Sequence, residues 1–211
     1  GLERLAEAGA VAEARAAHAA YFLRLVETAD PYLRTAEQLP WLRLLDAERD
    51  NIYGALQFAC DSGDADTALR IAAGLLMPLS IKGDYEQSAT LFARAAAVPG
   101  PAPENARAIV RGMAMLGEVF SGGRPPDDDE LAAMLAAVRA TDLHASPYVA
   151  LIEPITTLFT DNTAAGLAAV ERGLAHPDPW TRAMLLVMRG QIEENDGDAD
   201  GMLRDLTAAS G

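Results

Sequence analysis

Residues 67–98 read TALRIAAGLLMPLSIKGDYEQSATLFARAAAV, and this stretch decides the predicted fold. Its first half, up to Lys82, carries apolar residues at the spacing of one helix face. Gly83 can adopt a positive φ that ends this helix, and Asp84 can cap the next one. The second half repeats the pattern with an apolar stripe, Tyr85, Ala89, Phe92 and Ala96. The stretch therefore predicts a helical hairpin that turns at residues 83–85.

The composition of the 211-residue chain favours helices throughout. Half of the residues are hydrophobic, but only 6% are aromatic, and alanine supplies much of the hydrophobic half. Alanine costs no side-chain entropy in a helix and lets helices approach closely. No run of alternating β-branched and aromatic residues is bounded by turn residues, so no strands are predicted. We expect an all-α fold.

The net charge of −14, from 17 basic and 31 acidic residues, limits the classes of partner. A nucleic-acid-binding protein needs a basic face that displaces counterions from phosphates. We therefore expect no direct contact between this segment and nucleic acid, whereas a partner with a basic surface stays open. No stretch reaches the roughly 18 apolar residues that span a bilayer, so no membrane contact is expected.

The single cysteine and the first residues point to a cytoplasmic segment of a longer chain. Cys60 excludes an internal disulfide and fits a reducing compartment. No apolar core follows a basic start, so a signal peptide is not predicted. The chain opens in a helical pattern, GLERLAEAG, without a cap in front of it. We therefore expect a domain upstream of residue 1.

Turn residues separate a series of further helices. Pro78, in the first half of the hairpin, and Pro154, in the helix over residues 146–159, are expected to bend their helices and free the carbonyls of Gly74 and Ala150. A kink is also expected near Gly54 and the Asp50-Asn51 pair. Outside the hairpin, the predicted helices span residues 2–9, 11–28, 35–63, 106–120, 131–140, 146–159, 164–175, 180–195 and 199–209.

The tight turns recur at a nearly constant spacing. They fall at Gly83, Gly122, Asp161 and Gly197, which are 39, 39 and 36 residues apart. Repetition at this period is typical of an α-solenoid of antiparallel helix hairpins. We expect an N-terminal helical pair in residues 1–64 and four repeats in residues 65–211. The repeats span residues 67–97, 106–140, 146–175 and 180–209.

Two of these repeats resemble the tetratricopeptide repeat. Gly83-Asp84-Tyr85, with Phe92 and Ala95, matches the turn and second-helix positions of that family. In the last repeat the small first-helix position, the turn and the closing alanine are matched by Gly190, Gly197-Asp198 and Ala209. Ser88 and Met202 stand where the family prefers alanine, and the middle repeats match by spacing more than by residue. The resemblance implies degenerate tetratricopeptide-like repeats.

A second resemblance covers residues 2–98. ERLAEAG, HAAYFLRLVETADPYL, WLRLLDAERDNIYGALQFACDSGD and ALRIAAGLL follow one another as in STAND-class bacterial transcriptional regulators of the AfsR/SARP and LuxR-like kinds. In that family the segment follows an ATP-binding domain and a winged helix, and it opens the sensor repeats. The resemblance implies a sensor arm whose Walker motif lies upstream. No G-x-x-x-x-G-K-[ST] occurs in this chain, so no nucleotide cofactor is expected here.

No catalytic arrangement is predicted. His18, His144 and His176 lie far apart in the sequence, on different helical units, whereas acid–base and nucleophilic chemistry needs partners within hydrogen-bond reach. We expect His18 to be a packed residue on an apolar face. Cys60 is expected to be a small core residue near a helix end. The chain is therefore expected not to be an enzyme.

Two acidic stretches are candidate sites. Residues 196–201, DGDADG, reproduce the first half of a calcium-binding EF-hand loop, but Thr207 occupies the twelfth position, where the motif needs glutamate. We therefore expect an acidic turn and no metal. Acidic residues at 46, 48 and 50, beside Arg43 and Arg49, form either a solvated helix face with i,i+4 partners or a site. The former is expected.

A candidate partner or effector groove follows from the repeat pattern. In tetratricopeptide arrays some first-helix positions line the concave surface, and here these positions are unusually apolar, as binding sites often are. The alternative is a register shift of one or two residues, which would place them in the core. The predicted groove residues are Met77, Ile81, Leu116, Phe120, Tyr148, Leu151, Ile155, Phe159, Met184 and Val187.

The sequence therefore predicts a cytoplasmic sensor or protein-interaction arm of an ATP-dependent transcriptional regulator. Its partner would be a protein or an effector, and the parent protein's own ATPase domain is one such partner. A free-standing adaptor for a protein partner and a small-molecule sensor remain alternatives. The last helix has an apolar face, formed by Met202, Leu203 and Leu206, that would stack on further repeats or on a second copy in a homodimer.

Overall fold

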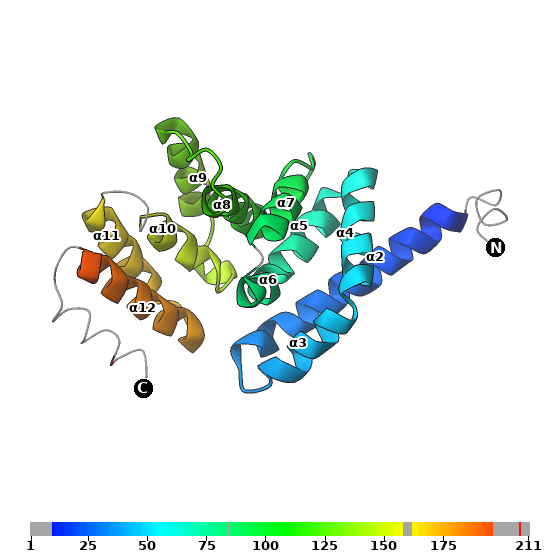
Figure 1. Cartoon of the computed structure of the whole chain (residues 1–211), viewed down its shortest axis with the longest axis horizontal. Helices are drawn as coiled ribbons and strands as arrows, with labels where there is room; N and C mark the ends of the chain where they lie inside the picture. Colours follow the sequence, from blue (N-terminus) through cyan, green and yellow to red (C-terminus); the bar gives the residue numbers. More distant parts are fainter. Residues whose placement is uncertain (1–9, 84, 158–161, 196–206, 208–211) are drawn as a thin grey trace. The chain divides into compact units, whose positions relative to one another are not determined.

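Every regular element is a helix in the computed structural model of the chain, which describes residues 10–83, 85–157, 162–195 and 207 (Figure 1). The expected all-α class is therefore confirmed. The chain divides between Pro125 and Pro126 into two compact units, called unit 1 and unit 2 here. The division expected at residue 64 rests on the repeat pattern of the turns and stays a prediction. Among the described residues, no helix combines the length and apolarity needed to span a bilayer.

Unit 1 begins with α2 (Ala10–Ala29), followed by the 3-10 helix η1 (Asp30–Arg34). The helix expected over residues 35–63 is instead two helices, α3 (Gln38–Ala47) and α4 (Arg49–Ser62). They separate at Glu48, which has φ −96° and ψ 6°, and Gly54 lies inside α4. The prediction of one kinked helix is wrong because the turn redirects the chain, so that α4 packs on α2 and α5.

The opening hairpin is present with one further break. Its first half consists of α5 (Ala65–Gly74) and α6 (Leu76–Lys82), which meet at Leu75, and its second half is α7 (Tyr85–Ala96). Pro78 has no N–H to donate to the carbonyl of Gly74, so the bend expected there is a break in the helix. Gly83 ends α6 with φ 69°, as predicted.

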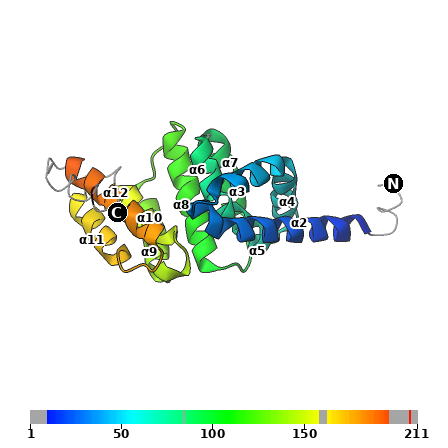
Figure 2. The ribbon, with the colours of Figure 1, turned by 90° about the horizontal axis from the view of Figure 1, so that it is seen from below.

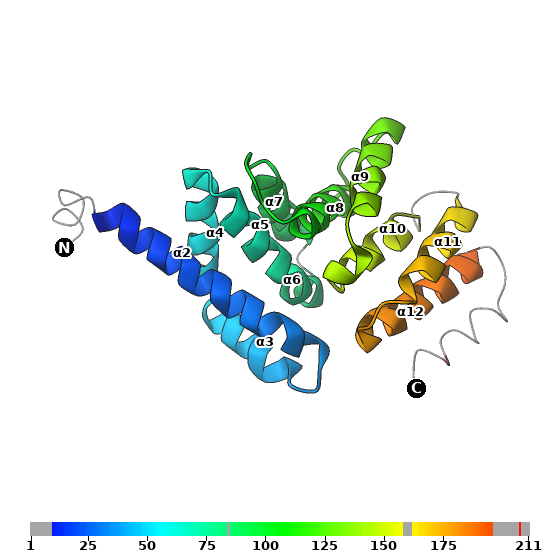
Figure 3. The same ribbon diagram turned by 180° about the vertical axis from the view of Figure 1, so that it is seen from behind.

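Unit 1 has one core, built where α2, α4, α5, α7 and α8 (Glu104–Phe120) meet. α2 packs on α4 and α5, and Figures 2 and 3 show it running past α4. α7 packs closely on α8, where a Cβ built on Gly117 would lie 2.7 Å from the Ala89 Cβ. Fully buried side chains of this core include Leu33, Ile52, Leu56, Leu69, Ile71, Phe92 and Ile109.

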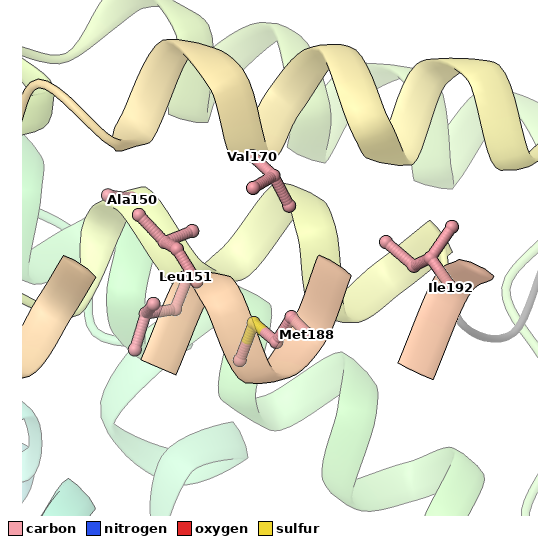
Figure 4. Packing of buried hydrophobic residues seen from close by; sticks show 6 residues of the cluster. Ala150, Leu151, Val170, Met188 and Ile192 are labelled. Carbon is pink, nitrogen blue, oxygen red and sulfur yellow. The ribbon is translucent and has the colours of Figure 1, made fainter. Parts of the chain in front are cut away.

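Unit 2 contains α9 (Asp128–Ala140), the 3-10 helix η2 (Leu143–Ala145), α10 (Val149–Thr157), α11 (Thr163–Gly173) and α12 (Pro179–Asn195). The cap of α9 is a capping box, in which the side chain of Asp127 accepts from the Glu130 N–H and the side chain of Glu130 accepts from the Asp127 N–H. The core lies between α10, α11 and α12. Figure 4 shows Val170 of α11 pointing toward Leu151 and Met188, which are buried with it.

The expected helix pairs are present in part. α5 and α6 pack on α7, and α10 packs on α11, as the repeats over residues 67–97 and 146–175 require. The expected pair over residues 106–140 is divided, because α8 belongs to unit 1 and α9 to unit 2. The predicted helices over residues 2–9 and 199–209 lie outside the described residues, apart from Thr207.

Candidate functional site

Unit 1 carries an apolar pocket of about 240 Å³ between α3, α4 and the α5–α6 junction. On α3 the lining residues Leu39, Leu42, Arg43 and Asp46 stand at i, i+3, i+4 and i+7, the spacing of one helix face. The second wall of the pocket is formed at the break between α5 and α6, where Leu75 and Pro78 line the pocket. The other lining residues are Leu45, Arg49, Ile52, Tyr53, Leu79, Ile81 and Lys82.

Apolar side chains around this pocket are unusually exposed. α3 has five large apolar residues among ten, yet Leu45 is the only one of them that is buried. Leu39 is 61% exposed and Leu44 is 40% exposed, and across the pocket Ile81 of α6 is 50% exposed. Leu39 and Ile81 line the same pocket, whereas Leu44 does not. Exposed apolar surface that is contiguous, as at Leu39 and Ile81, marks interaction sites in soluble proteins. We call Leu39, Leu44 and Ile81, together with the pocket, the α3 surface.

The charged side chains of the pocket are mainly cationic. Lys82 Nζ donates to Asp46 Oδ1, which joins the end of α6 to α3. This hydrogen bond and the charge of Lys82 hold the pKa of the Asp46 carboxyl below its ordinary value. Arg49 Nη1 lies 3.9 Å from the same Asp46 oxygen, and Arg49 Nε lies 3.6 Å from Asp50 Oδ1.

Arg43 differs from these residues because it forms no ion pair or hydrogen bond with another residue in the described part of the chain. Its side chain is exposed and lines the pocket. The run over residues 46–50 was expected to be a solvated helix face. Its side chains are largely exposed, but Asp46 and Arg49 also line the pocket, together with Arg43.

The predicted groove residues fall into four groups. Ile81 and Phe120 are exposed, and Ile155, Met184 and Val187 are half-buried. Phe159 lies outside the described residues. The remaining four, Met77, Leu116, Tyr148 and Leu151, are buried and belong to the cores rather than to an open face. Because the ten residues come from both units, a single groove that contains them all stays a prediction.

These four residues are buried because other helices pack on them, and the repeat pattern of the sequence does not predict that packing. Leu151 packs with Val170 and Leu185 in the core of unit 2. The ring of Tyr148 meets Trp180 edge to face, with centroids 5.8 Å apart. The sequence missed the pocket residues on α3, although the large apolar content of residues 39–45 was a usable signal.

The histidines are placed differently from expectation. His18 is exposed beside Phe22, with ring centroids 4.7 Å apart, rather than packed in the core. It lines an open crevice of about 640 Å³ between α2 and α4. The rings of His144 and His176 lie 5.5 Å apart within unit 2, a pairing that sequence separation did not predict. Nδ1 of His176 accepts the backbone N–H of Asp178 at 3.0 Å.

The remaining candidates are Cys60 and the acidic side chains that a metal ion would need. Cys60 is half-buried near the end of α4, and burial raises the pKa of its thiol. Within the described ranges, no cluster of three or more His, Cys, Asp or Glu side chains has a geometry suited to a metal ion. The acidic turn over residues 196–201 lies outside those ranges.

Comparison with known proteins identifies no relative of this chain. No model of a protein family matches the chain, and neither the curated proteins nor the solved structures include a significant match.

Proposed function

We propose that this chain is a non-enzymatic helical arm that binds a protein partner through the α3 surface. The observation that carries the proposal is the state of α3, where only Leu45 of five large apolar residues is buried, whereas α5 buries both Leu69 and Ile71. Covering Leu39, Leu44 and Ile81 would remove apolar surface from water at roughly 25 cal/mol per Å². A protein surface is the kind of partner that covers three such residues on two helices.

We further propose that the arm is an α-solenoid of degenerate tetratricopeptide-like repeats. Support comes from helices that pack on their neighbours in sequence, α7 on α8, α10 on α11 and α11 on α12. The nearly constant spacing of the turns in the sequence supports the same architecture. Solenoids use their exposed helix faces to bind other proteins.

The parent protein would be an ATP-dependent transcriptional regulator of the STAND class, in the cytoplasm. This part of the proposal rests on the resemblance over residues 2–98. Binding at the α3 surface would change the contacts of the arm with the upstream ATPase domain. A switch of this kind requires the partner to bind one state of the regulator more tightly than the other.

Two experiments test the proposal. The coding sequence upstream of residue 1 should contain a P-loop and a winged helix, and their absence would remove the regulator context. In the full-length regulator, Leu39→Asp combined with Ile81→Asp should abolish the transcriptional response without changing thermal unfolding, because both side chains are at least half exposed. Tyr21→Asp, at an apolar residue of α2 that is 55% exposed and lines none of these pockets, is the matched control. A normal response from the double variant would refute the role of the α3 surface.

A small-molecule sensor fits this pocket less well. Ligand pockets usually measure about 300–1,000 Å³ and enclose most of the ligand. At about 240 Å³ the pocket is smaller, and its rim residues would remain exposed around a ligand that filled it. The side chains of a partner protein would fill the pocket and cover the rim together.

A further inference from the structure

We infer that the α3 surface binds an acidic amphipathic helix of a partner protein, an inference that rests on the proposed function. The first observation is the charge of the pocket. Three of its four charged lining residues are basic, Arg43, Arg49 and Lys82, and one is acidic, Asp46. In the whole chain the balance is the reverse, with 17 basic and 31 acidic residues. The pocket is therefore a cationic site on a strongly anionic protein.

The cations differ in how far their charge is already neutralised. Lys82 is paired with Asp46, and Arg49 lies beside Asp46 and Asp50. Arg43 has no such neighbour within the described residues. A carboxylate of a partner would therefore pair mainly with Arg43, whose planar guanidinium suits a bidentate contact. Elsewhere the negative charge of the chain would repel the same partner, which favours binding at this site.

The volume of the pocket indicates which side chains of the partner would enter it beside the carboxylate. A cavity of about 150 Å³ holds one benzene molecule. The pocket, at about 240 Å³, therefore has room for one large or two small apolar side chains. Leu39 and Ile81 stand exposed on its rim and would contact the flanks of whatever enters. An amphipathic helix can both fill the pocket and contact its rim, because its side chains at i, i+3, i+4 and i+7 share one apolar face.

A second, smaller pocket extends the apolar surface within unit 1. It measures about 30 Å³ and is lined by residues of α6, α7 and α8, including Phe120, which is 48% exposed. Leu79 lines both pockets, so the two adjoin at this residue. The second pocket would give the partner helix an apolar contact beyond the main pocket.

The test uses three labelled 14-residue peptides with the same four leucines at i, i+3, i+4 and i+7. The remaining positions are mainly glutamate in the first peptide, glutamine in the second and lysine in the third. Binding of each peptide to the 211-residue chain is measured by fluorescence anisotropy at low and high salt. We expect the glutamate peptide to bind at least about tenfold more tightly than the lysine peptide, and salt to narrow this difference. The glutamine peptide should lie between them.

Variants of the chain assign the binding to the α3 surface. Arg43→Glu should weaken binding of the glutamate peptide about five- to tenfold and strengthen binding of the lysine peptide. Leu39→Asp should weaken all three peptides. Arg111→Glu makes the same charge change on an exposed arginine of α8 that lines none of the pockets described, so it should leave the affinities unchanged. Circular dichroism checks that each variant is folded.

Each outcome decides between specific alternatives. Equal binding of the three peptides would overturn the acidic preference while leaving a partner-binding α3 surface in place. Binding that Arg43→Glu and Arg111→Glu weaken equally would place the site elsewhere. Failure of the glutamate peptide to bind would overturn the inference, and the reporter assay on the full-length regulator would then test the proposed function separately. Sedimentation showing a dimer that Leu39→Asp dissociates would identify a second copy as the occupant instead.

Discussion

Replacement of Glu153 by glutamine should destabilise unit 2, because this carboxylate joins three helices. Glu153 lies on α10 and its side chain is 8% exposed. Its Oε1 accepts from Nε of Arg139 on α9 at 3.0 Å, and its Oε2 accepts from Nη2 of Arg172 on α11 at 2.7 Å. Burial raises the pKa of Glu153, but the hydrogen bonds from the two arginines outweigh it and hold the pKa below its ordinary value of 4.5.

The size of the effect follows from the exposure of the partners. A hydrogen bond to a charged group contributes about 1.5–3 kcal/mol to stability. The Arg139 and Arg172 side chains are 56% and 46% exposed, so water screens each pair and can solvate the arginines once the carboxylate is gone. Glutamine also keeps one accepting oxygen. We therefore expect Glu153→Gln to lower the free energy of unfolding of unit 2 by about 1–2 kcal/mol at pH 7.

Urea unfolding of the whole chain can isolate unit 2, because each unit contains one tryptophan. In a Trp41→Phe background the fluorescence of Trp180 reports on unit 2 alone. The matched control is Glu171→Gln, which breaks a single pair of a 63% exposed carboxylate with Arg189 and should cost at most about 0.5 kcal/mol. If Glu153→Gln cost no more than this control, the ion pairs of Glu153 would not stabilise the unit.

The same variant gives a pH dependence with a definite sign. The pKa of Glu153 is lower in the folded than in the unfolded protein, so its contribution is complete above the unfolded pKa. It is lost as the pH falls through the folded pKa. The difference between wild type and Glu153→Gln should therefore be largest near neutral pH and shrink below about pH 4.5. A difference that grew on acidification would contradict this assignment.

Four further predictions concern stability and reactivity. Gly117→Ala should destabilise unit 1 by about 1–3 kcal/mol in urea unfolding, because its Cβ would lie 2.9 Å from the backbone Cα of Ala89. Gly54→Ala should stabilise it by about 0.5–1 kcal/mol, since no atom lies within 4 Å of the added Cβ and the helix gains propensity. Asp127→Ala removes the capping box of α9 and should cost about 1 kcal/mol in unit 2. Alkylation of Cys60 at pH 8 should be slower than that of a free cysteine, because burial raises its pKa, and equal rates would contradict this.

The sequence determined the elements whose signals are local. Gly83 has the positive φ that its position before Asp84 predicted, and α2, α8 and α12 begin and end within a few residues of the expected bounds. These features depend on the backbone freedom of glycine and on apolar periodicity, both of which can be read from neighbouring residues. The all-α class follows from the same signals.

Only the tertiary structure decided which apolar residues face a neighbour. Periodicity puts Leu116 and Phe120 of α8 on one helix face, yet Leu116 is buried and Phe120 is 48% exposed. The turn at Glu48 and the break at Leu75 set α3 and α6 around one pocket, although the lining residues of these two helices are more than 30 residues apart in the chain. Local sequence fixes the face of a helix, but whether that face is covered depends on which distant helix packs there.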